Sequence, residues 1–134
     1  MIKCASAESM ATHIFKPQQY TIEDVFAFAE SFINGGTEDF EASLTQAVRL
    51  IESEGFENAD VVVITDGICN VSETFICDFR EKIKQLKFSV TGIVIDILAE
   101  ATSFNIEPFC EKVYRLSEMS GDDIASAIIS SKVR

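Results

Sequence analysis

The strongest hydrophobic pattern in the chain is the run Val61-Val62-Val63-Ile64 within the segment Asp60–Thr65. Consecutive β-branched residues leave a strand no polar face, which is typical of a parallel strand covered on both sides. Residues 88–95 form a second long apolar run, and residues 112–116 have the look of a short last strand. We predict that these three segments are strands of one sheet.

Weaker patterns precede and separate these strands. Alternation over Ile2–Ser6 and again over residues 10–15 predicts a hairpin. Thr21, followed three residues later by Asp24, matches a capping box and predicts the start of a helix that runs to Asn34.

Three further helices are predicted by apolar periodicity. The first of them follows Phe40 and ends at Gly55, the second is capped by Ser72, and the last opens with Ser120 and Asp123. We expect the apolar stripes of the four helices, with Phe26, to face the core. The stripes are Val25, Phe28, Ala29 and Phe32; Phe40, Leu44, Ala47, Val48 and Ile51; Phe75, Ile76, Phe79, Ile83 and Leu86; and Ile124, Ala127 and Ile128.

Strands that alternate with helices predict βαβ units. We therefore expect an α/β fold with a three-layer, mostly parallel, Rossmann-like sheet and helices on both faces. At 134 residues, with 47% hydrophobic residues and 11 Phe, the chain is expected to form a single domain with a substantial core.

Charge narrows the classes of partner. The chain has 11 basic and 22 acidic residues, a net charge of −11, which opposes binding to nucleic acid and to anionic membranes. No apolar run approaches the roughly 18 residues of a membrane span, and no basic-then-apolar leader opens the chain. We expect a cytoplasmic protein.

The candidate chemistry follows the predicted strand Asp60–Thr65. Asp66 and Gly67 come directly after this strand, and ligands of open α/β sheets bind outside the carboxyl ends of the strands. The loop Asn34-Gly35-Gly36-Thr37 supplies a tight turn that ends in a hydroxyl group. Carboxylate and hydroxyl oxygens suit Mg²⁺. The predicted metal ligands are Thr37 and Asp66, with Gly35, Gly36 and Gly67 in the adjacent loops.

Histidine and cysteine usage gives no signal for zinc or nucleophilic catalysis. His13 is the single histidine and lies in the predicted hairpin. The four cysteines include no C-x-x-C pair. Cys4 and Cys77 lie in apolar patterns and are expected in the core, whereas Cys69, after Asp66, is expected to be exposed.

The phrases Gly35-Gly36-Thr37, Asp60–Thr65 with Asp66-Gly67, and residues 88–96 resemble a von Willebrand factor type A (VWA) domain of the bacterial intracellular, CoxE-like branch. In that family the phrases contribute to a metal-ion-dependent adhesion site (MIDAS). The resemblance implies that Thr37 is the threonine ligand and that Asp66 is the aspartate of the next metal-binding loop. It also implies a protein-binding module that is not an enzyme, with a MoxR-type AAA+ ATPase as partner.

Two features depart from the family pattern. The leading metal motif Asp-x-Ser-x-Ser is absent, and Met1 stands where the family enters its second strand, so we expect a domain truncated at its N-terminus. Glu38 separates Thr37 from Asp39, whereas relatives usually carry the acidic residue directly after the threonine. With half of its ligands missing, the site is predicted to bind Mg²⁺ with a dissociation constant above about 1 mM, or roughly 4 kcal/mol.

The missing first strand would expose an apolar edge of Asp60–Thr65. Three outcomes are open: Ile2–Ser6 closes against that edge, a second copy pairs with it in a homodimer, or an upstream segment of a longer protein completes the sheet. We expect the last in the biological protein, and a closed sheet or a dimer for the chain by itself.

Other functions are left open by the residues. Asp66 could serve a hydrolase or phosphoryl-transfer domain on a doubly wound sheet, although no phosphate-binding loop or nucleophile elbow is present. The chain could also be an inactive structural fragment. In a purely structural role, Asp66 would cap a turn and Gly35-Gly36 would end a helix.

Overall fold

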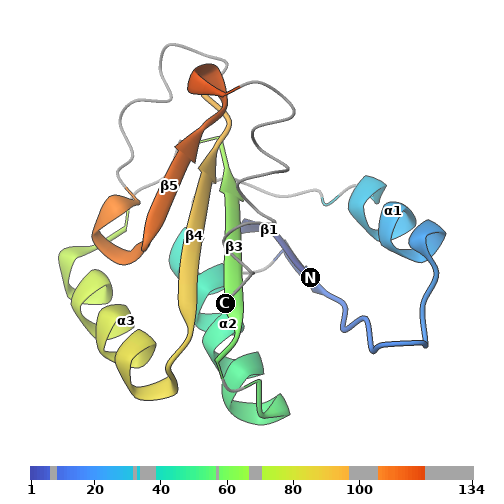
Figure 1. Ribbon diagram of the computed structural model, residues 1–134, viewed down its shortest axis with the longest axis horizontal. Coiled ribbons are helices and arrows are strands. Elements are labelled where there is room, and N and C mark those ends of the chain that lie inside the picture. Colours follow the sequence, from blue (N-terminus) through green and yellow to red (C-terminus); the bar gives the residue numbers. More distant parts are fainter. Residues whose placement is uncertain are drawn as a thin grey trace.

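The fold is a mixed α/β arrangement in which helices flank a parallel three-stranded sheet (Figure 1). It is seen in a computed structural model. The residues that the structure describes are 1–6, 9–31, 33, 39–56, 58–66, 71–96 and 106–119. The predicted helix that opens with Ser120 and Asp123 lies outside these residues, as do Phe32 and Cys69.

The three predicted strands form the sheet, in the order β3-β4-β5. Strand β3 (Asp60–Thr65) pairs in parallel with β4 (Ser89–Val94) along its whole length, from Asp60 opposite Ser89 to Thr65 opposite Val94. Strand β5 (Lys112–Arg115) pairs in parallel with the second half of β4. The carboxyl ends of all three strands therefore meet at one edge of the sheet, as predicted.

Helices α2 (Phe40–Glu54) and α3 (Glu73–Leu86) pack on one face of this sheet. Their apolar stripes meet the inward side chains of β3 and β4 and the short 3₁₀ helix η2 (Glu107–Phe109). A further 3₁₀ helix, η3 (Leu116–Glu118), follows β5. The core residues of this cluster are Leu44, Val48, Ile51, Val63, Phe79, Phe88, Val90, Val94, Ile106 and Phe109.

The helix ends follow the chemistry predicted from the sequence. Ser72 caps α3 by accepting a hydrogen bond from the Phe75 N–H, and Gly55 ends α2 with a left-handed φ of 67°. Thr21 and Asp24 form the predicted capping box at the start of α1 (Ile22–Glu30). These local predictions are confirmed.

The N-terminal part forms a second, two-stranded sheet. Strands β1 (Ile2–Ser6) and β2 (Ser9–Thr12) pair in an antiparallel hairpin, which confirms the hairpin but ends its second strand earlier than predicted. Because β1 pairs with β2 and is not a strand of the β3-β4-β5 sheet, the expected closing of Ile2–Ser6 onto Asp60–Thr65 is wrong. Helix α1 stands apart from α2 and α3 in Figure 1.

Several burial predictions are also wrong. Helix α1 ends at Glu30 rather than at Asn34 and contains no buried residue, and its Phe26 is 58% exposed. Strand β3 is not covered on both faces, because Ile64 is 63% exposed. Cys4 and Cys77 are exposed rather than part of the core. In each case the local pattern gave the secondary structure, but burial depends on which other elements cover that face.

Candidate functional site

The candidate site lies at the edge of the sheet where the three parallel strands end. We call it the carboxyl edge; β3, β4 and β5 end there at Thr65, Val94 and Arg115. Asp66 follows β3 at this edge, and its side chain is exposed. The predicted partner Thr37 lies outside the described residues, as do Gly35, Gly36 and Gly67. The pairing of Thr37 with Asp66 therefore stays a prediction.

A second carboxylate lies at the carboxyl edge after the neighbouring strand. The Ile95 N–H donates to the Thr65 carbonyl over 2.8 Å, which continues the parallel pairing just beyond β4. Asp96 comes next and accepts two hydrogen bonds from Ser117, one from its N–H (2.9 Å) and one from its hydroxyl (2.6 Å). These bonds join the segment after β4 to the segment after β5.

The hydrogen bonds from Ser117 also favour the ionised form of Asp96. They stabilise the ionised carboxylate and lower the pKa of Asp96, with the side-chain bond as the larger cause and the backbone bond as the second. Asp96 is therefore held as an anion at the carboxyl edge.

The N-termini of α2 and α3 are linked to each other by a side chain. Asp39 caps α2 by accepting from the Ala42 N–H over 2.9 Å. Glu41, in the first turn of α2, accepts from the Ser72 N–H over 2.7 Å and so binds the start of α3. Carboxylates are favourable at helix N-termini because they offset the helix dipole. These two carboxylates thus have a structural role.

Cys4 of the hairpin joins the same region. Its thiol donates to the Asp39 carbonyl over 3.7 Å. Desolvation, and secondarily the negative charge of Asp39, raise the pKa of the Cys4 thiol. The neutral form of the Cys4 thiol is therefore favoured.

The described donor atoms do not by themselves make a metal site. Within the ranges that the structure describes, no three side chains of His, Cys, Asp or Glu converge as they would around a metal ion. The ring of His13 packs against two aromatic rings, 4.3 Å from that of Phe15 and 5.7 Å from that of Phe28. The carboxyl edge carries the exposed carboxylate of Asp66 and the partly buried carboxylate of Asp96.

Asp96 and Ser117 were missed in reasoning from the sequence. The signal for Asp96 was present, because it is the first carboxylate after the buried run of residues 88–95, just as Asp66 follows Asp60–Thr65. Ser117 had no such signal, since only the parallel pairing of β5 with β4 brings it beside Asp96.

Comparisons with known proteins give distant relatives. The chain is 27% identical over 113 residues to the uncharacterized protein MJ0811 of Methanocaldococcus jannaschii, and 26% identical over 112 residues to the uncharacterized protein MJ0077 of the same organism. Each alignment covers 84% of this chain but only 26% and 27% of the respective relative, so the chain spans about a quarter of the length of these proteins. No family model and no solved structure matches the chain.

None of the described helices combines the length and the apolar character needed to cross a bilayer.

Proposed function

We propose that the chain is a protein-interaction module of the VWA type, which binds a partner protein at the carboxyl edge and is not an enzyme. The observation that carries this proposal is the position of Asp66, an exposed carboxylate directly after β3 in a parallel sheet. In such sheets this edge is where ligands bind.

The surroundings of Asp66 support a role in binding. Asp96, whose pKa is lowered by the hydrogen bonds from Ser117, provides a second carboxylate after the adjacent strand. The proposal includes the finer fold, a three-layer Rossmann-like arrangement with helices on both faces of the sheet. It also includes an incomplete metal site in which Thr37 and Asp66 hold Mg²⁺ weakly, so that a carboxylate of the partner can complete the coordination.

The partner class that we propose is a MoxR-type AAA+ ATPase, which follows from the resemblance of the Thr37 and Asp66 loops to the intracellular VWA branch. The chain covers only about a quarter of the length of its relatives MJ0811 and MJ0077. In proteins of that length, segments outside the matched quarter can also contact the partner.

The test is binding of the purified chain to a MoxR-type ATPase encoded in the same genome. Pull-down is performed without nucleotide, in Mg²⁺ at about 10 mM, tenfold above the lower bound of about 1 mM predicted for the dissociation constant, and again in EDTA. We expect binding in Mg²⁺, and loss of binding in EDTA and in the variant Asp66→Asn.

A matched control is available at the other end of the same strand. Asp60→Asn makes the same charge change at the amino end of β3, where the Asp60 carboxylate accepts from the Ser89 hydroxyl over 2.6 Å. This variant should bind as the wild type does. Binding that ignores both EDTA and Asp66→Asn, or no binding at all, would contradict the proposal.

A further inference from the structure

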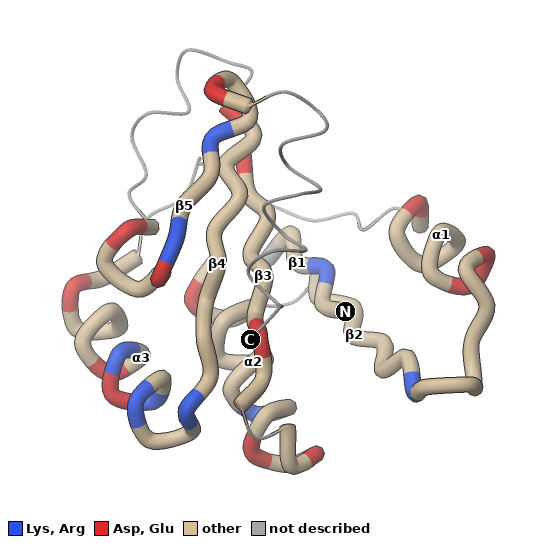
Figure 2. Tube along the Cα trace, in the orientation of Figure 1, with Lys and Arg blue, Asp and Glu red and all other residues tan. Residues whose placement is uncertain are grey.

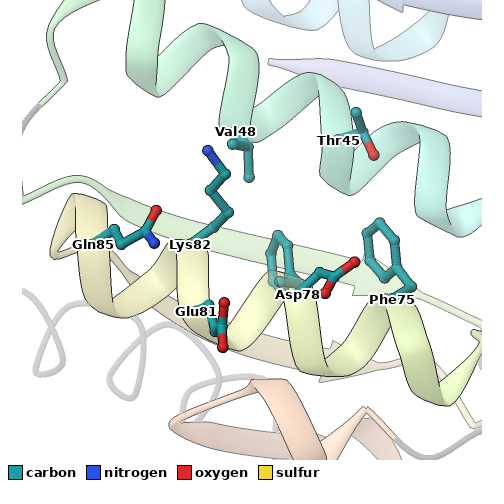
Figure 3. A pocket seen from close by; sticks show the side chains of 8 residues that line it. Thr45, Val48, Phe75, Asp78, Glu81, Lys82 and Gln85 are labelled. Atoms are coloured by element: carbon teal, nitrogen blue, oxygen red, sulfur yellow. The ribbon is translucent and has the colours of Figure 1, made fainter.

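A groove lies between α2 and α3 on the helical layer, and Asp66 is not among the residues that line it (Figure 3). It has a volume of about 360 Å³, and its apolar lining comes from Val48 of α2 and from Phe75 and Phe79 of α3. The rings of Phe75 and Phe79 stack, with centroids 5.7 Å apart and planes inclined by 15°. Because Phe75 is only half-buried, the groove offers an aromatic surface to a ligand.

The groove is elongated along α3. Its lining extends from Phe75 to Gln85, which corresponds to about 15 Å at the helical rise of 1.5 Å per residue. Figure 3 shows Phe75 near Thr45 at one end and Lys82 reaching towards Val48 further along. A space of this length suits a row of side chains from one helix better than a single side chain.

The rim of the groove is acidic. Lys82 forms an ion pair with Glu52 of α2 over 2.8 Å, so its charge is already balanced. This pairing replaces the i, i+4 pair with Asp78 that the spacing along α3 allows. Asp78 and Glu81 also line the groove, and in the described part of the chain neither forms an ion pair. The rim therefore carries two carboxylates that lack a cationic partner there.

We propose that this groove is a docking site for a cationic amphipathic helix of a partner protein. Bulky apolar side chains of that helix pack on the half-buried ring of Phe75, behind which Phe79 forms the floor of the groove, and its Lys or Arg residues pair with Asp78 and Glu81. A second copy of this chain does not fit, because its net charge of −11 opposes an acidic rim. The site goes beyond the proposed role of the carboxyl edge, since it uses neither Asp66 nor a metal ion.

The probe is a labelled 14-residue synthetic peptide with leucines on one helical face and lysines beside them. Binding to the full chain is measured by fluorescence anisotropy at about 0.15 M salt, where long-range attraction to an acidic protein is largely screened. We expect this peptide to bind. A peptide with glutamates in place of the lysines, and one with its leucines scrambled off the common face, should not.

Two variants locate the binding in the groove. The double variant Asp78→Asn/Glu81→Gln removes the rim charges without touching the core, and we expect it to weaken binding about fivefold, as for the loss of two exposed ion pairs. Thr45→Trp places a large ring in the groove from α2 and should abolish binding. Circular dichroism and the thermal midpoint show whether each variant is folded.

The matched charge control lies on α1, which carries Glu23, Asp24 and Glu30 and no basic residue (Figure 2). The variant Glu23→Gln/Glu30→Gln makes the same change in net charge far from the groove. It should alter binding by less than about twofold, because screening limits the effect of distant charges.

The outcomes separate this proposal from the proposed function. Peptide binding should be the same in Mg²⁺ and in EDTA and should survive Asp66→Asn, whatever the ATPase pull-down shows. Unchanged affinity in folded Asp78→Asn/Glu81→Gln and Thr45→Trp, or equal loss in the α1 control, would overturn the docking site. Self-association of the chain that Thr45→Trp abolishes would show instead that a second copy occupies the groove.

Discussion

At the scale of single residues, Gly92 shows how closely β4 approaches the segment before β5. A Cβ atom at this position would overlap Cδ1 of Ile106 and lie 3.2 Å from Sγ of Cys110. Ile106 is fully buried and has little room to move. We expect Gly92→Ala to lower the free energy of unfolding by about 1–3 kcal/mol, the usual effect of overpacking, as measured by urea denaturation.

A rescue variant tests the cause of this loss. Ile106→Val removes the overlapping Cδ1 atom and should itself lower the free energy of unfolding by about 0.5–1.5 kcal/mol. The double variant Gly92→Ala/Ile106→Val should be more stable than the sum of the two single effects predicts. Simple additivity would mean that the overlap with Ile106 is not the source of the strain.

Asp96 gives a pH prediction at the same scale. Its pKa is lowered in the folded state by the hydrogen bonds from Ser117. A depressed carboxyl pKa stabilises the fold above the pKa of the unfolded chain, about 3.9, and that contribution is lost as the pH falls through the folded pKa. We expect Asp96→Asn to be less stable than the wild type at about pH 6, and the difference to shrink below about pH 4.

Urea denaturation at several pH values measures the difference in stability between Asp96→Asn and the wild type. The other carboxyl groups are common to the two proteins, so their contributions cancel. Ser117→Ala removes the hydroxyl donor but keeps the N–H donor, so it should cause a smaller loss with the same pH dependence. A stability difference that stays constant down to low pH would contradict the assigned role of Ser117.

At the scale of elements, helix caps should have unequal effects. Ser72 caps α3, which contributes Phe79 to the core, whereas Thr21 caps α1, which contains no buried residue. We expect Ser72→Ala to lower the global free energy of unfolding by about 1 kcal/mol. Thr21→Ala should leave global stability nearly unchanged and speed amide hydrogen exchange within α1 alone, because a short helix without core contacts opens locally.

Chemical denaturation and hydrogen exchange followed by mass spectrometry distinguish the two cases. If Thr21→Ala lowered global stability as much as Ser72→Ala does, α1 would be coupled to the core more strongly than its exposure indicates.

At this scale, features that depend on neighbouring residues were predicted from the sequence, whereas features that depend on distant elements were not. The capping box of Thr21 and Asp24, the Ser72 cap and the Gly55 C-cap depend on neighbours within a few residues, so the sequence predicts them. The burial of Phe26 and Ile64 depends on elements distant in the sequence. An apolar stripe shows which face could be covered, but not whether anything covers it.

In the candidate site, too, some features could be predicted from the sequence and others could not. The position of Asp66 after β3 was predicted, because a polar residue after a buried run lies at the end of a strand. The bond between Asp96 and Ser117 could not be predicted, since it depends on the register of β5 against β4. The pairing of Thr37 with Asp66, and the truncation of the domain, stay predictions.

At the scale of the whole molecule, charge and exposed apolar surface act against each other. In the described part of the chain β3 is at one edge of the sheet, and Ile64 on this strand is 63% exposed. Apolar edge strands favour pairing between copies. The net charge of −11 opposes that pairing through repulsion, which salt screens.

We therefore expect self-association to increase between about 0.05 M and 0.5 M NaCl, as the Debye length falls well below the size of the protein. Sedimentation velocity over a concentration series measures it. Ile64→Lys should suppress the association without loss of stability, because Ile64 is largely exposed. Phe26→Lys, at a similarly exposed site on α1, should leave it unchanged if the edge of β3 is the contact. If Phe26→Lys suppresses association and Ile64→Lys does not, the copies meet through α1, and the sheet edge is not the interface.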